Sequence, residues 1–244
     1  MMFEGGSAVR LLDADPDLGA GLDDRAVEEA RPRLVAPVDS IAPGTWETQR
    51  GLPKPDGQLG LLVLEGLMAR DVVLAKTTCA ELVGPGDLLR PWDDLREGAP
   101  VQPSVEWHVL EPTKLALIDR PTVQALSTWP EIISVLVLRS VARAQALALS
   151  FAISSMTGLK MRLLFLLWHL AGRWGRVSRE GVSLPLPLTH LMVSRLVGAS
   201  RPSVSTALKD LETEGSLSRR KGGGWILHGE PPLGLERPSD RRAA

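Results

Sequence analysis

The strongest constraint on this chain is residues 188–217, a stretch typical of two short amphipathic helices joined by a tight turn. The first helix is expected over Thr189–Val197, with its first residue as the N-cap. Gly198 follows, and a glycine directly after the last apolar residue signals the end of a helix. Ser200 then caps a second helix over about 201–214. The apolar residues of that helix recur at helical spacing: Val204, Ala207, Leu208 and Leu211.

A β-hairpin is expected directly after the second helix. Residues 216–220 and 224–227 alternate as short strands, and Lys221 begins the glycine-rich turn between them. Two helices joined by a three-residue turn form a helix-turn-helix, and a basic-tipped hairpin adds the wing of a winged helix. In such a unit the second helix enters the major groove of DNA. A helical hairpin in an ordinary all-α core is the alternative, and the wing argues against it.

The charges of the chain are divided unevenly. The net charge is −1, yet 14 of the 28 Lys and Arg lie from Gly158 onward, with only 7 of the 29 Asp and Glu. A basic segment is the electrostatic footprint of a DNA-binding domain, because phosphate contacts supply much of the affinity. Residues 1–157 are acidic in balance, and we expect them not to touch phosphate.

Composition narrows the possible chemistry. A single cysteine, Cys79, excludes a disulfide framework, a cysteine zinc site and a four-cysteine iron–sulfur cluster within one chain. The sequence shows no phosphate loop, no cluster of metal ligands and no Ser/His/Asp or Cys/His arrangement in a structural context. We therefore expect no enzyme, no metal and no cofactor, with a haem held by Cys79 or His108 as an alternative.

The chain is expected to be cytoplasmic. Its start lacks the basic and apolar regions of a signal peptide. Its long apolar stretches contain Arg or Lys, so we expect none of them to cross a membrane.

The N-terminal part of the chain predicts a few helices and then a β-rich domain. Residues 1–10 are expected to be frayed, and short helices are expected from Asp15-Pro16 and over Asp23–Ala30. From Val35 onward, short apolar runs are separated by Gly and Pro, a pattern that predicts a small β-barrel or sandwich. Strands are expected in Gly60–Leu74, with a turn near Gly66, and over 105–110 and 114–118.

A long helix is expected from Pro130 to about Ser155. It is apolar around most of its circumference, so one face is expected to pack on the β-domain and another to pair with a second copy in a coiled coil. We expect the coiled-coil contact among Val135, Leu138, Val141, Ala142, Leu149 and Ala152. A further apolar face contains Val137, Val141, Ala144, Ala148 and Phe151, so which face forms the contact stays open. A buried helix in a monomer is the alternative.

The order of a β-domain, a long helix and a winged helix-turn-helix resembles the Crp/Fnr family of bacterial transcription regulators. Residues 188–217 are similar to that family's signature L-T-x-x-x-[LIM]-[AG]-x-x-x-G-x-[ST]-R-x-[ST]-V-x-R-x-L-x-x-L-x-x-x-G-x-[IL]. The matching residues are Leu188, Thr189, Gly198, Ser200, Arg201, Ser203, Val204, Leu208, Leu211 and Gly215. The β-domain resembles the family more loosely, through Gly60–Val73 and the turn Pro85-Gly86-Asp87.

The nucleotide-binding cassette of the family is degenerate in this chain. Cyclic-nucleotide-binding members carry G-E-[LIM] followed further along by R-[ST]-A, which hold the cyclic phosphate. Residues 88–95 here read LLRPWDDL without a Gly-Glu pair, and Pro103 stands where the Arg belongs. Asp93, Asp94 and Glu97 add negative charge nearby. We therefore expect no cAMP binding.

The recognition helix also departs from the family. The family commonly has Glu after the residue equivalent to Arg201 and Arg at the place of Thr206, whereas this chain has Pro202 and Thr206. Arg201 stays the best candidate for a guanine contact. The DNA half-site is therefore expected to differ from TGTGA-like and TTGAT-like sequences.

The resemblance implies a role for each polar residue of the helix-turn-helix and the wing. Arg201, Ser205 and Thr206 are expected to face bases. Phosphate contacts are expected from Thr189, His190, Ser200, Ser203, Lys209, Arg219, Arg220 and Lys221.

The sequence thus predicts an α+β protein with an N-terminal β-roll or jelly-roll, a long dimerisation helix and a C-terminal winged helix-turn-helix. The expected segments are 1–34 (acidic, helical), 35–120 (β-roll), 121–156 (linker and dimerisation helix), 157–229 (winged helix-turn-helix) and 230–244 (disordered tail). The expected function is that of a homodimeric, sequence-specific regulator on double-stranded DNA, with RNA polymerase as a possible partner. The alternative is an effector-sensing regulator whose β-roll binds a small molecule other than cAMP or, less favoured, a cyclic nucleotide or haem.

Overall fold

The computed structural model describes residues 3, 6–48, 52, 56–93 and 100–232 of the chain. These residues form two compact units, divided between Ala146 and Leu147. The elements follow the expected order of a sheet domain, a long helix and a helix-turn-helix with a wing, so the predicted α+β fold is confirmed. The predicted tail from 233 onward lies outside the described residues.

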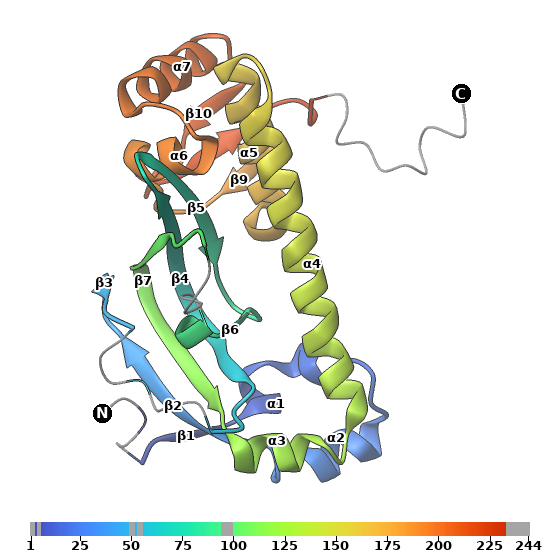
Figure 1. Cartoon of the computed structure of the whole chain (residues 1–244). Helices are drawn as coiled ribbons and strands as arrows, with labels where there is room; N and C mark the ends of the chain where they lie inside the picture. The colour runs from blue at the N-terminus through green and yellow to red at the C-terminus, as the bar shows by residue number, and fades with distance from the viewer. Residues whose placement is uncertain (1–2, 4–5, 49–51, 53–55, 94–99, 233–244) are drawn as a thin grey trace. The chain divides into compact units, whose positions relative to one another are not determined.

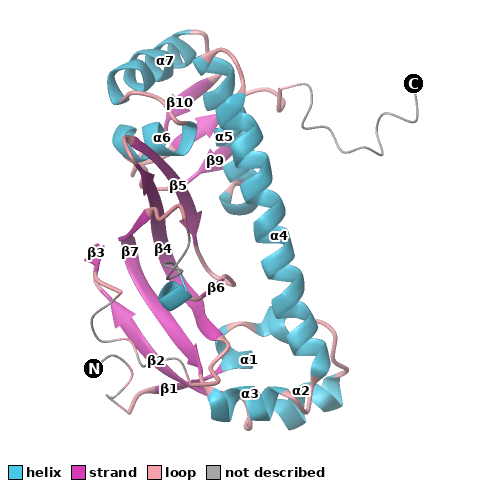
Figure 2. Ribbon diagram, in the orientation of Figure 1, coloured by secondary structure: helices cyan, strands magenta, loops and turns pink. Residues whose placement is uncertain are grey.

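The first unit is an antiparallel sheet with helices gathered at one end (Figures 1 and 2). The strands pair in the order β1-β2-β7-β4-β5, while β3 also pairs with β7 and β6 with β4. The strands are β1 (Ala8–Arg10), β2 (Val35–Ile41), β3 (Gly44–Trp46), β4 (Gly60–Leu74), β5 (Thr77–Val83), β6 (Leu88–Leu89) and β7 (Ser104–Ile118). The helices are α1 (Leu11–Ala14), the 3₁₀ turns η1 (Pro16–Gly19) and η2 (Pro91–Asp93), α2 (Asp24–Ala30), α3 (Arg120–Leu126) and the first part of α4 (Pro130–Ser155).

The two longest strands differ from the prediction. β4 and β7 are each one strand of 15 residues, where the pattern predicts two shorter strands. Gly66 does not turn the chain: it lies in a stretch of β4 whose register against β7 shifts between Val63 and Met68. Its φ is +96°, and a Cβ there would lie 2.4 Å from the carbonyl oxygen of Pro112. The glycine lets the two backbones approach closely at a bulge, so β4 bends without reversing.

The side chains of the sheet alternate between two hydrophobic cores. On β4, Leu62 and Leu64 contribute to a core shared with the helices, whereas Leu61 and Val63 contribute to a core inside the roll. This separation follows from the two-residue period of a strand. Inside the roll, the rings of Trp46 and Trp107 pack edge to face, with centroids 5.8 Å apart. Both faces of the sheet are therefore buried over this part of its length.

The N-terminal segment is an integral part of this unit. The expected fraying of residues 1–10 is wrong for Ala8–Arg10, because these residues pair with β2 as strand β1. Asp15-Pro16 begins a 3₁₀ helix, and α2 forms as predicted, with the Asp23 side chain accepting the Ala26 N–H at 2.8 Å. The Asp15 carboxylate receives two hydrogen bonds from the Arg139 guanidinium, which binds the segment to α4.

Helix α4 has a polar attachment on one side and apolar residues exposed on the other. Arg143 donates to the buried Glu81 of β5, with Nη2 2.7 Å from Oε1, and Arg70 of β4 also pairs with Glu81 at 3.2 Å. The exposed apolar side chains include Leu138 at 66% and Phe151 at 74%. Among the described helices, α4 has the length and composition that would allow a membrane crossing.

The second unit combines three helices with a small sheet. It contains the end of α4, α5 (Leu159–Trp174), β8 (Arg176–Ser178), β9 (Gly181–Leu184), α6 (His190–Val197), α7 (Arg201–Thr213), β10 (Leu217–Arg219) and β11 (Trp225–Leu227). The strands pair in the order β10-β11-β9-β8, so the predicted wing is confirmed and two further strands extend its sheet. Trp225 is fully buried in this unit.

Candidate nucleic-acid interface

The helix-turn-helix is positioned by local caps. The Thr189 hydroxyl accepts the Met192 N–H at 3.1 Å, and the Ser200 hydroxyl accepts the Ser203 N–H at 3.3 Å. Gly198 ends α6 in the left-handed conformation, with φ +62°. These caps satisfy backbone groups that a helix end leaves free, and they fix the turn between α6 and α7. Both helices therefore form where the sequence predicts them.

Helix α7 has one buried and one exposed face. The apolar residues Val204, Ala207, Leu208 and Leu211 are buried in the unit. Arg201, Thr206 and Lys209 are exposed. Arg201 and Lys209 have no ion-pair partner among the described residues, so both cations are available to an anionic ligand. The exposed face thus carries positive charge and hydroxyls, which suit base edges and phosphates.

His190, a predicted phosphate contact, joins α6 to α7 and to the wing. Its Nδ1 lies 2.8 Å from the Ser205 hydroxyl, and its Nε2 contacts the Arg219 guanidinium. Burial, followed by the charge of Arg219, lowers the pKa of His190 below its ordinary value. The imidazole is therefore neutral at pH 7.

The neutral ring of His190 is part of a series of hydrogen bonds that runs from Arg219 to Ser205. Arg219 can donate only to an unprotonated Nε2, so the ring proton is assigned to Nδ1, which donates to Ser205. The Ser205 hydroxyl in turn donates to the carbonyl oxygen of Arg201 at 3.0 Å. Ser205 is half-buried and its hydroxyl is directed toward His190. The hydroxyl of Thr206 donates to the carbonyl oxygen of Pro202 at 3.3 Å.

Arg219 lies at the centre of the contacts between the wing and α7. Its Nε donates to the Glu212 carboxylate of α7 at 3.0 Å, and its guanidinium stacks 5.1 Å from the centroid of the Trp225 ring. Glu212 neutralises part of its charge. Arg219 therefore fixes the wing against the helix as well as adding positive charge to the surface.

A basic groove lies between the β8–β9 hairpin and the wing. It is lined by Ser178, Arg179, Glu180, Ser183, Ser218, Arg219, Arg220, Lys221 and Ile226. Four of these residues are cations and one is an acid. Lys221 is exposed and has no ion-pair partner in the described part of the chain, whereas Arg220 donates to the carbonyl oxygen of Gly223 at 3.3 Å.

Arg179 lines this groove and is not among the contact residues that the sequence predicted. It lies in the turn of the β8–β9 hairpin, about forty residues before the wing. The antiparallel pairing of β9 with β11 brings it to the same groove as Arg220 and Lys221. A basic residue in the turn Arg179-Glu180 is the only local signal, and the pairing cannot be deduced from it.

The region of the nucleotide cassette is occupied by internal contacts. The Arg90 guanidinium donates to the carbonyl oxygens of Gln58 and Leu59 at 3.1 and 2.7 Å, and it also pairs with Asp93. Asp87 closes the predicted turn by accepting the Gly84 N–H at 2.9 Å. Pro103 precedes β7, and residues 94–99, which include Asp94 and Glu97, lie outside the described residues. The Arg90 guanidinium therefore already has hydrogen-bond and ion-pair partners within the protein.

The residues predicted to form the coiled-coil contact differ in their exposure to solvent. Val135 packs against the core shared by the sheet and the helices. Leu138, Val141 and Leu149 are exposed by 66%, 48% and 38%. Ala142 and Ala152 are exposed as well.

The comparisons with known proteins decide what the C-terminal unit is. The family model of the Crp-like helix-turn-helix domain matches residues 161–231. Residues 161–231 are therefore similar to a Crp-like helix-turn-helix domain. This match covers α5 from Met161 onward, the β8–β9 hairpin, α6, α7 and the wing, so the basic groove and helix α7 both lie within the matched residues. No curated protein sequence matches the chain.

Solved structures show the fold of most of the chain. A cyclic nucleotide-binding domain containing protein from Listeria monocytogenes EGD-e is 17% identical over 78% of this chain and 87% of that one, with a TM-score of 0.62. FixK2 from Bradyrhizobium japonicum is 18% identical over 80% and 93%, with a TM-score of 0.58. CLP of Xanthomonas campestris, a c-di-GMP responsive global regulator, is 18% identical over 85% and 100%, with a TM-score of 0.57. Over the aligned residues the chain therefore shares the fold of these proteins.

Proposed function

We propose that this protein is a sequence-specific regulator of transcription that binds double-stranded DNA as a homodimer. The observation that carries the proposal is the exposed face of α7, where Arg201 and Lys209 have no ion-pair partner among the described residues and lie beside a basic wing. In a Crp-like helix-turn-helix domain this face meets the major groove. An enzymatic role has no support in this arrangement.

Arg201 is proposed to read a base, with Ser205 and Thr206 beside it. Arg201 lies in the first turn of α7, where side chains of a recognition helix reach base edges. Binding sites are first selected from a random pool of double-stranded DNA. Arg201→Ala should then cost about 1–3 kcal/mol on the selected site and relax the preference at one base pair. Equal losses on selected and random DNA would contradict base reading.

Phosphate contacts are proposed for the wing and the helix ends, through Thr189, His190, Ser200, Ser203, Lys209, Arg219, Arg220 and Lys221. Lys221 is the sharpest test because its amine has no ion-pair partner within the described residues. Lys221→Ala should weaken binding to every sequence and reduce the slope of log K against log salt by about 1. Lys76→Ala removes a charge from the first unit and serves as the matched control. An unchanged salt slope in Lys221→Ala would exclude the contact.

The homodimer is proposed to form along α4. Its exposed residues Val137, Val141, Ala144, Ala148 and Phe151 follow one another at intervals of four and three residues, the spacing of a coiled-coil seam. Val141 belongs both to this stripe and to the residues predicted from sequence. A seam between two copies would remove these side chains from water, and Arg139 and Arg143 would keep the opposite side on the sheet domain.

Val141→Glu tests the dimer. Sedimentation equilibrium should give a dimer for the unchanged chain and a monomer for the variant, because a charge at the seam of a coiled coil is buried unpaired. Ser140→Glu adds the same charge on the flank of the helix and should stay dimeric. A monomeric unchanged chain would refute the proposal.

A role for an effector is the second candidate, favoured by the sheet domain that accompanies the helix-turn-helix. We propose that the effector is not cAMP, because Arg90 is bound to backbone carbonyls and Asp93 and no other arginine takes the cassette position in the sequence. Calorimetric titration with cAMP should show no heat of binding, and tight cAMP binding would refute this. Titration with cGMP and cyclic dinucleotides tests them as candidate effectors. A cytoplasmic location and a contact with RNA polymerase belong to the same proposal.

A further inference from the structure

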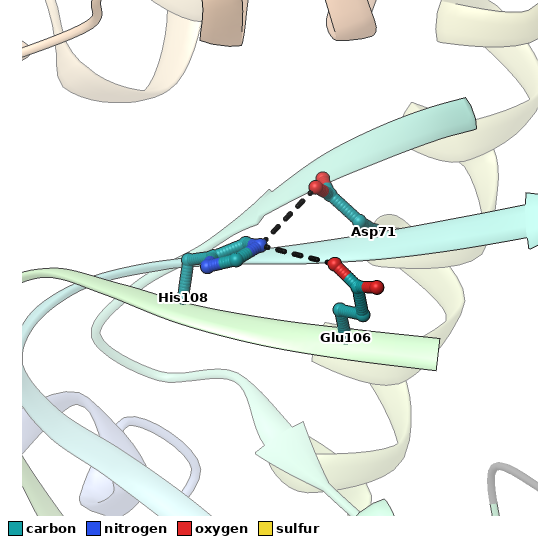
Figure 3. A group of neighbouring side chains, drawn as sticks. All are labelled: Asp71, Glu106 and His108. Atoms are coloured by element: carbon teal, nitrogen blue, oxygen red, sulfur yellow. Dashed lines mark ion pairs between the residues drawn. The ribbon is translucent and has the colours of Figure 1, made fainter. Parts of the chain in front are cut away.

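Three potential metal ligands converge on one face of the sheet in the first unit. Asp71 comes from β4, and Glu106 and His108 come from β7 (Figure 3). The antiparallel register places Asp71 directly opposite Glu106, and Ala69 opposite His108. Side chains two residues apart in a strand share a face, so all three project from the same side of the sheet.

The distances between these groups are those of ion pairs, and they also fit the ligands of one metal ion. His108 Nε2 lies 3.4 Å from an Asp71 carboxylate oxygen and 3.7 Å from a Glu106 oxygen, and the three ligand atoms lie within 4.8 Å of one another. N–H···O hydrogen bonds are shorter, at about 2.7–3.2 Å. Two ligand atoms each about 2.1 Å from a tetrahedral zinc ion are about 3.4 Å apart.

The histidine nitrogen that points into the cluster is buried. Nε2 of His108 has no hydrogen-bond partner among the residues that the structure describes. A buried imidazole nitrogen without such a bond is costly unless another group contacts it. Its lone pair would coordinate an ion held by the two carboxylates.

The charges also favour a cation. Two carboxylates directly opposite each other on neighbouring strands repel, and the Asp71 side chain is only 1% exposed. Glu106 is 55% exposed, which gives an ion access from solvent.

We propose that Asp71, Glu106 and His108 bind a divalent transition-metal ion such as Zn²⁺, with water in the remaining coordination position. Imidazole and carboxylate are ligands of zinc, and three protein ligands with one open position are typical of an accessible zinc site. The sequence predicted no metal site, because Asp71 is separated from its partners along the chain and only the strand register joins them. The site does not depend on the proposed role in transcription.

The experiment is calorimetric titration of Zn²⁺ into the chelator-treated full-length protein. One ion per chain should bind, and Zn²⁺ should raise the thermal unfolding midpoint because the ion binds only the folded site. Glu106→Gln and His108→Gln should each weaken binding by at least about tenfold. Both side chains are partly exposed, so these variants are expected to fold, which circular dichroism verifies.

Matched controls separate this site from adventitious binding. Glu111→Gln removes an exposed acid from the same strand, and His169→Gln removes a histidine from the other unit. Both should bind Zn²⁺ as the unchanged chain does. Absence of stoichiometric binding, or equal affinity in His108→Gln and the unchanged chain, would overturn the proposal.

Discussion

The helix-turn-helix and the sheet domain differ in the distance along the chain over which their structure is specified. The turn between α6 and α7 depends on residues only a few positions apart, such as Thr189 with Met192 and Ser200 with Ser203. In the sheet domain, Val38 pairs with Ala116, and Arg139 binds Asp15. Local caps can be recognised in a sequence, whereas distant pairings need a register that no short window contains.

The same difference should govern how each region responds to mutation. In the sheet domain, Gly66 allows two long strands to approach each other closely. In the helix-turn-helix, Gly198 is needed mainly because its own backbone has a positive φ. Stability measurements on variants in the two regions test this difference.

Gly66→Val should be the most damaging single change. A Cβ at Gly66 meets the backbone of Pro112 at 2.4 Å, and its φ of +96° disfavours any side chain. We expect a loss of about 3–5 kcal/mol of unfolding free energy, from strain plus displacement of β7. Urea unfolding followed by circular dichroism measures it.

Gly198→Val is the matched comparison in the helix-turn-helix. A Cβ there meets nothing within 4 Å, and only the φ of +62° is unfavourable. The cost should be about 1–2 kcal/mol. Equal losses at Gly66 and Gly198 would show that the close approach to β7 does not matter.

Glu81→Gln should be the next largest effect. The Glu81 side chain is 8% exposed and accepts from both Arg70 and Arg143, so the variant leaves two half-buried cations poorly compensated. We expect a loss of about 2–3 kcal/mol in chemical denaturation. Glu65→Gln removes an exposed carboxylate 3.7 Å from Lys114 and should change stability by less than about 1 kcal/mol.

The helix caps should give similar, smaller effects in the two regions. Ser200→Ala removes the cap of α7 and Asp23→Ala removes the cap of α2. Each should cost about 1 kcal/mol, because each leaves one backbone N–H without its acceptor. A much larger loss in Ser200→Ala would mean that its hydroxyl does more than cap the helix.

Acidification should destabilise the second unit modestly. Burial lowers the pKa of His169, and burial with Arg219 lowers the pKa of His190. The unfolded chain then binds more protons than the folded one as the pH falls through about 6.5, so stability falls with it. Thermal unfolding midpoints between pH 7.5 and 5.5 measure this. His169→Gln should flatten the dependence, and an unchanged slope would assign it to other groups.

The sequence predicted those features of the candidate interface that depend on residues close together in the chain. Arg201 and Lys209 lie on the exposed face of α7 because the apolar residues of the helix are buried on the other side. The connection of His190 to Ser205 and Arg219 was not predicted, since it joins three elements through the tertiary fold. Arg179 was missed for the same reason.

The sequence predicted that this domain is rich in β-strands, but it did not predict the length of the two longest strands. Short apolar runs with turn residues indicated strands, but β4 and β7 are continuous because bulges bend them instead of turns. The stretch 8–10 was expected to fray because its three residues carry no strong strand signal, and pairing with β2 supplies the missing stability.

The helix-turn-helix, its wing, the long apolar helix and the basic charge of the C-terminal part could all be predicted from the amino-acid sequence. These depend on caps, helical spacing and composition, which act within a few residues. In contrast, the fold had to be known to see that Asp71, Glu106 and His108 meet and that Arg179 lines a groove with the wing. The same holds for the packing of Val135 and the exposure of Val137 and Phe151. Strand register and helix docking bring distant residues together, and they are fixed by the packing of the whole unit.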